Sequence, residues 1–174
     1  MAEIDELESV VDKTISTLQS TPALRFVKEW HKVNGFIPSK NPAISVGFDS
    51  EHYEEYTQNL DKCTAKLNIF ATLDNRALAP NDRQKNEDRL EYGERSIRKM
   101  ARIIRRCLTG NYSLGGAADS SFPPKIEYLT AEGYEDLHAA VITLDVEVFV
   151  ARKDAGDYPT IATIDMKMEI EGGL

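Results

Sequence analysis

The stretch HAAVITLDVEVFVAR, residues 138–152, has the pattern of a strand with one buried face. Apolar side chains occupy every second position and polar side chains occupy the positions between them, which is the period of a strand. The apolar set is Ile142, Leu144, Val146, Val148 and Val150. The stretch therefore predicts a long core strand, antiparallel to its neighbour. It places Asp145 and Glu147 on the opposite face, where we expect a partner to bind.

Other segments also favour strands. AISVGFD (43–49), KCTAKLNIFATL (62–73) and KIEYLTA (125–131) are β-rich or alternate with a period of two. ALRFVKEWHKV (23–33) can be interpreted as a strand with Leu24, Phe26 and Trp30 on one face, and a helix is the open alternative. TIATIDMKMEIEG (160–172) alternates again near the C-terminus, where it can pair within its own chain or add to a neighbour's sheet.

Two segments carry helical periodicity. Ile4, Leu7, Val11, Ile15 and Leu18 form one stripe that ends before Thr21-Pro22. A longer helix is predicted from about Asp82 to about Leu108, with Asn81 or Asp82 as the N-cap and Gly110 closing the end. Its apolar stripe is Leu90, Ile97, Met100, Ile104 and Leu108.

The remaining segments are predicted to connect these elements. GFIPSKNP (35–42) is a loop, NYSLGGAADSS (111–121) a mobile loop ended by Pro123-Pro124, and EGYEDL (132–137) a turn. The order is then helix, two or three strands, long helix, and two or three strands. This order predicts an α+β fold, a mostly antiparallel sheet with an N-terminal and a long central helix. We expect one domain over residues 1–174, with 153–174 as a possible C-terminal strand or exchangeable arm.

Composition narrows the class of protein. Cys63 and Cys107 are the two cysteines, and neither has zinc-ligand spacing, which favours a reducing compartment. The acidic N-terminus does not resemble a signal peptide, and apolar runs are far shorter than the roughly 20 residues of a membrane span. We therefore expect a protein made in the cytosol, without a membrane partner.

The net charge of −8 is unevenly distributed. Residues 81–110 carry five acidic and nine basic side chains, whereas residues 127–174 carry eleven acidic and three basic. Within the long helix, basic residues three or four apart form a stripe: Arg95, Arg98, Arg102 and Arg105 or Arg106. Guanidinium groups suit carboxylates of a neighbouring subunit as well as phosphates, and a solvated helix face is the third interpretation.

The sequence predicts no catalytic, metal or cofactor site. Glu132, Glu135, Asp136 and His138 match no ligand spacing and are better explained by a polar turn. GNYSLGG (110–116) lacks the Gly-Lys-Ser/Thr ending of a phosphate loop. With no convergent acid, base or nucleophile, an enzyme is the least favoured class.

Taken in order, these segments resemble a viral family. The N-terminal helix, the F-x-P…NP-A-I-x-V loop and strand, the AKLNIFATL strand, the arginine-bearing helix and the AAVITLDVEVFV strand are together similar to tail-terminator or tail-completion proteins of tailed bacteriophages. The similarity covers roughly residues 4–152. It is one of order and pattern, without a catalytic signature.

The resemblance implies a structural subunit without enzyme activity or cofactor. It implies a ring, commonly a hexamer, on the head-proximal end of the tail tube, where it stops tube polymerisation and offers a surface to the head–tail connector. Its expected partners are itself, the tube protein and the connector, with the genome passing through the ring and no sequence-specific nucleic-acid contact. Its expected location is the virion tail, after assembly in the host cytoplasm.

Interface residues follow from this implication as a hypothesis. Arg95, Arg98, Arg102 and Arg105 are expected to meet acidic side chains of the next subunit, and Asp145 and Glu147 are candidates for the opposite surface. A head–tail adaptor and a tube subunit remain alternatives within the virion. From a different class, a nucleic-acid-binding α+β module would use the arginine helix.

Overall fold

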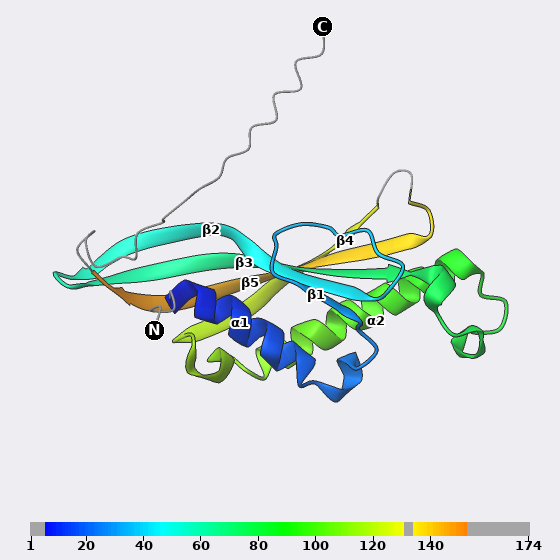
Figure 1. The fold of residues 1–174 in the computed structure, drawn as a ribbon, viewed down its shortest axis with the longest axis horizontal. Helices are drawn as coiled ribbons and strands as arrows, with labels where there is room; N and C mark the ends of the chain where they lie inside the picture. The colour runs from blue at the N-terminus through cyan, green and yellow to red at the C-terminus, as the bar shows by residue number, and fades with distance from the viewer. Residues whose placement is uncertain (1–5, 131–133, 153–174) are drawn as a thin grey trace, which may run out of the picture.

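A computed structural model describes residues 6–130 and 134–152, which form one five-stranded sheet with helices on one face (Figure 1). The helices are α1 (Glu6–Gln19) and α2 (Arg89–Thr109). The strands are β1 (Glu29–His31), β2 (Ala43–Thr57), β3 (Leu60–Asp74), β4 (Ser120–Leu129) and β5 (Leu137–Ala151). Short 3-10 turns are η1 (Pro22–Leu24), η2 (Asn75–Ala77), η3 (Pro80–Asp82) and η4 (Leu114–Gly116). The predicted α+β class is confirmed.

The strand order is β1-β2-β3-β5-β4. β1 pairs with β2 in parallel, and the other pairs are antiparallel. The opening stretch is β5, and it lies between β3 and β4 with Ile142 opposite both Ile69 and Ile126. The alternation predicted for this strand is confirmed, because the five apolar residues face the helices and four of them are at most 6% exposed.

α1 packs its apolar stripe onto the core. Leu7, Val11, Ile15 and Leu18 are buried, as the periodicity predicts, whereas Ile4 lies outside the described residues. The helix ends before η1, which Pro22 begins. Leu24 is fully buried there, but Phe26 is exposed, so the strand predicted over residues 23–33 is reduced to Glu29–His31.

α2 begins seven residues later than predicted. Asp88, rather than Asn81 or Asp82, is the N-cap, and Asp88 and Glu91 form a reciprocal capping box. Asn86 has a positive φ of 65°, which an α-helix cannot contain, so residues 80–87 form a separate turn and loop. Leu90 is 52% exposed and does not belong to the buried stripe. The rest of that stripe is confirmed, since Ile97, Met100, Ile104 and Leu108 are buried.

The segment predicted as a mobile loop is anchored at its centre. Leu114 in η4 is fully buried beside α1, and β4 begins at Ser120. Pro123 and Pro124 therefore lie inside β4, where the register with β5 shifts between Phe122 and Lys125. The terminal alternating segment 160–172 lies outside the described residues.

The sheet face opposite the helices is partly covered. The loop after β1 crosses β2 and β3 there: the Ser45 hydroxyl donates to the Gly35 carbonyl at 2.7 Å, and the Asn68 amide donates to Asn34. A Cβ atom at Gly47 would overlap the backbone of Asn34, so only glycine permits this approach. Beyond the loop, the outward-facing side chains of β3, β5 and β4, which are mostly polar but include Phe122 and Phe149, form the rest of this face. We call it the outer sheet face.

Candidate interaction surface

Arg95 is held within its own chain. Its guanidinium donates to the Glu87 carboxylate at 2.7 and 3.0 Å and to the Asp82 carbonyl at 2.9 Å, and it lies over the Tyr92 ring. The hydrogen bond from Arg95 lowers the pKa of Glu87 to about 2. These contacts fix the loop before α2 onto the helix and leave Arg95 little freedom for an external partner.

The other arginines of α2 differ in their environments. Arg98 forms an exposed ion pair with Glu94 at 3.4 Å. Arg105 donates to the Pro123 carbonyl at 3.1 Å and lies over the Phe122 ring, which ties α2 to β4. Arg102 and Arg106 are exposed and form no ion pair with any described residue.

Lys99 shares the exposed side of α2 with these two arginines, at helical spacing. We call Lys99, Arg102 and Arg106 the basic helix row. Of the predicted arginines, Arg102 and Arg106 are the ones whose charge is available to a partner.

Asp145 and Glu147 both lie on the outer sheet face. Glu147 pairs with Lys62 of β3 at 2.9 Å, and this contact raises the pKa of the lysine. Asp145 is half-buried, lies in register with Lys66 of β3 and Phe122 of β4, and forms no ion pair with a described residue. Asp145 is therefore the more available of the two carboxylates.

The structure places the basic and acidic candidates on opposite sides of the subunit. α2 packs on the inner face of the sheet (Figure 1), with Ile97, Met100 and Ile104 buried. Helical spacing therefore turns the basic helix row away from the sheet. Asp145 points away from the other face of the same sheet. These charges cannot meet within one subunit, but they can meet when one copy stacks its helix layer against another copy's sheet.

The turn before β5 is held by ion pairs. Asp136 lies 3.5 Å from Arg76 and 3.9 Å from Arg89, and its carbonyl accepts from the Asn75 N–H. Glu135 is exposed, and Glu132 lies outside the described residues. Among residues 6–130 and 134–152, no three His, Cys, Asp or Glu side chains are grouped to hold a metal ion.

His138 is half-buried between the turn and α2. Its Nε2 lies 3.3 Å from the Asn75 amide nitrogen. A Cβ atom at Gly93 would overlap the imidazole, so glycine at that position of α2 gives the ring its space. Burial lowers the pKa of His138, and the nearby carboxylates of Glu94, Asp136 and Asp74 oppose this shift.

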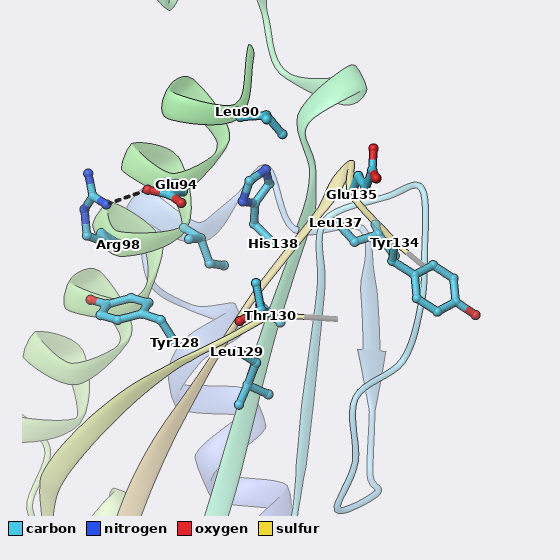
Figure 2. Close-up of a pocket in the computed structure, with 12 residues that line it drawn as sticks. Leu90, Glu94, Arg98, Tyr128, Leu129, Thr130, Tyr134, Glu135, Leu137 and His138 are labelled. Atoms are coloured by element: carbon cyan, nitrogen blue, oxygen red, sulfur yellow. Dashed lines mark hydrogen bonds and ion pairs between the residues drawn. The ribbon is translucent and has the colours of Figure 1, made fainter. Parts of the chain in front are cut away.

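An open groove of about 670 Å³ lies beside this histidine, between the start of α2 and the adjoining ends of β4 and β5 (Figure 2). Four of its lining residues are large and 41–52% exposed: Leu90, Tyr128, Leu129 and Tyr134. Ile97, Glu94 and Arg98 line its helix side, and Leu137 and Ala139 line it from the other face of β5. We call it the β4 groove.

The β4 groove could not be predicted from the sequence. Leu90 fits the apolar stripe of the long helix, and the adjacent Tyr128 and Leu129 belong to a strand whose position at the sheet edge depends on contacts between distant segments. One feature of the sequence sets Leu90 apart from the core residues. It lies seven residues before Ile97, whereas the later members of the stripe are three or four residues apart.

Comparison of the sequence with protein families and with curated proteins identifies no relative. No protein-family model matches the chain, and no curated protein matches it in sequence. None of the helices in the described part of the chain is long and apolar enough to cross a membrane.

Proposed function

We propose that this chain is a phage tail terminator, a structural subunit that closes into a ring on the head-proximal end of the tail tube. The ring stops tube polymerisation and provides the joining surface for the head connector. The described fold agrees with the element order on which the sequence resemblance depends: a helix, strands, a long arginine-bearing helix and closing strands.

The observation that carries the proposal is the opposite placement of opposite charges. The basic helix row projects from the helix layer, and Asp145 projects from the outer sheet face. Two different surfaces that complement each other produce heterologous contacts, which close into a ring when the rotation between copies permits. A self-complementary dimer would instead require one surface to pair with itself.

Exposed aromatic groups on the outer sheet face support the same contact. Phe122 is 53% exposed beside Asp145, and the rings of Tyr56 and Phe149 contact each other in a tilted arrangement, with centroids 4.8 Å apart, further along the face. Aromatic side chains surrounded by charged residues are typical of protein interfaces. A neighbour's α2 laid across this face would cover Phe122 and bring the basic helix row to Asp145.

The test is a charge exchange between the two surfaces. We expect Arg102→Glu with Arg106→Glu to weaken self-association at least tenfold, since like charges then face each other across the contact. Asp145→Lys should weaken it in the same direction. The variant with all three changes should recover most of the lost affinity, measured by sedimentation velocity, with a smaller effect at high salt.

Arg25→Glu with Lys28→Glu is the matched control, because it makes the same charge change at exposed positions after α1. It should leave association close to that of the unmodified chain. The proposed contact is wrong if the control weakens assembly as much as the basic-row variant does. Failure of the triple variant to recover would also contradict it.

A nucleic-acid-binding module is the second candidate, because the basic helix row is exposed. Its log–log salt slope would be roughly −0.9 for each phosphate neutralised. Tight, salt-sensitive binding of duplex DNA by the monomer would favour this candidate over the ring.

A further inference from the structure

We propose that the β4 groove and the adjoining edge of β4 bind residues 160–170 of a second copy of this chain. The proposal rests on the ring proposed above and specifies one contact that joins its subunits. The neighbour's segment adds a strand to the sheet and places its apolar side chains against the groove.

The edge of β4 is open along one half only. β4 is the last strand of the described sheet, so one of its edges has no strand neighbour there. In its first half, Pro123 and Pro124 lack N–H groups and the Pro123 carbonyl already accepts from Arg105. In the second half, Lys125–Leu129, the N–H and C=O groups that point away from β5 remain available for pairing.

This open half leads directly into the β4 groove. Tyr128 belongs to both and points to the helix side of the sheet, where Leu90 also lines the groove (Figure 2). Leu129, the next residue, points to the opposite face, and the Tyr134 ring packs against Phe36. Leu90 and Tyr128 are 52% and 46% exposed, although each is large enough to contribute about 1.5–3 kcal/mol if fully buried. An exposed apolar surface beside an unpaired edge fits an incoming strand with one apolar face.

Residues 160–170 have the required pattern. Ala162, Ile164, Met166, Met168 and Ile170 would share one face of a strand, and Thr163, Asp165, Lys167 and Glu169 the other. The wider segment 153–174 carries five acidic and two basic side chains. A segment of this charge is complementary to Arg98, which lines the groove, and to Arg105, which donates to β4.

The direction in which the chain leaves β5 favours a second copy as the source. Arg152 donates to the Asp61 carboxylate and the Gln58 carbonyl, so it is bound to the β2–β3 hairpin, on the side of β5 away from β4. On the other side of β5, the Asp119 N–H donates to the Glu147 carbonyl, and the Asp119 carboxylate accepts from the Phe149 N–H. The segment before β4 therefore lies between the end of β5 and the open edge of β4. The groove lies at the opposite end of β5, a strand about 50 Å long at roughly 3.3 Å per residue.

The test is a cross-link between two full-length chains in a Cys107→Ser background, which leaves only the fully buried Cys63. One chain carries Tyr128→Cys and a tag, and the other carries Met166→Cys. After co-assembly and treatment with a short bismaleimide, we expect a covalent heterodimer. Asp165→Cys, on the other face of the strand, is the matched control and should give at least fivefold less product.

A heterodimer formed with this preference supports the exchange. A cross-link that forms only within a single chain carrying both cysteines would overturn it, because the segment would then occupy its own groove. Equal yields from Met166→Cys and Asp165→Cys would overturn it as well. A closed ring that gives no cross-link contradicts the strand exchange alone, whereas a chain that never self-associates contradicts the ring too.

Discussion

His138 and Gly93 show how single residues connect the layers of this fold. The imidazole fits against α2 only because Gly93 has no side chain there, and its Nε2 lies within hydrogen-bonding distance of the Asn75 amide. A neutral ring can accept that hydrogen bond, but a protonated ring cannot. The charge state of His138 is therefore linked to the stability of the turn that begins β5.

Because of this link, we expect the free energy of unfolding to depend on pH. The pKa of His138 is lower in the folded chain than its unfolded value of about 6.5, so the unfolded chain binds the proton more readily. The contribution to stability is complete above about pH 6.5 and is lost as the pH falls toward the folded pKa. The free energy of unfolding, measured by urea denaturation, should decrease between about pH 7 and about pH 5.

His138→Asn is the control for this dependence. The slope in this pH window should become shallower in the variant, whatever its absolute stability. Glu87 and Asp74 have lowered pKa values and so act at lower pH, below about 4. An unchanged slope in the variant would show that His138 is not responsible.

The arginines show what residue types alone can predict. Their spacing correctly indicated a basic face on α2. It could not indicate that Glu87, eight residues before Arg95, folds back and binds it, because that contact depends on the loop made by Asn86. Of the predicted interface residues, Arg102 and Asp145 are the ones whose side chains form neither an ion pair nor a hydrogen bond with the described residues.

At the scale of elements, two leucines show that helical periodicity in the sequence and burial in the structure can differ. Leu90 fits the helical stripe but precedes the part of α2 that contacts the sheet, whereas Leu114 lies in a glycine-rich segment and is fully buried. Helical periodicity is a local signal, and burial depends on which elements pack together. Hence periodicity predicted β5 and most of α2 well, but not the start of α2 or the anchoring of η4.

We expect the two leucines to respond oppositely to truncation. Leu114→Ala should lower the free energy of unfolding by about 2–5 kcal/mol, since it leaves a cavity in the core. Leu90→Ala should change it by no more than about 0.5 kcal/mol, as for an exposed side chain. Chemical denaturation of both variants measures the difference, and similar losses would mean that the packing of η4 or the start of α2 is different from that described.

At the scale of the whole molecule, the sequence predicted the α+β class but not the arrangement of the strands. Alternation identified which face of β5 is buried, because one period is repeated over many residues. Nothing in β4 or β5 indicated that β5 lies inside the sheet and β4 at its edge, since that order depends on contacts between distant segments. The β4 groove follows from this order, and so it became visible only in three dimensions.

The same arrangement explains why a ring is the assembly we propose. One subunit presents a basic helix layer, an outer sheet face with Asp145 and exposed aromatic groups, and an open strand edge, all on different sides. Contacts that join two different surfaces relate the copies head to tail. Such contacts either close into a ring or continue as an open polymer, and this distinction separates a terminator from a tube subunit.

Native mass spectrometry of the purified full-length chain over a range of concentrations tests this account most directly. The account predicts one closed oligomer of fixed copy number, a hexamer if the family resemblance holds, with no series of larger masses. A chain that stays monomeric at every concentration would contradict the ring. An open-ended series of masses would contradict the terminator and indicate a tube subunit.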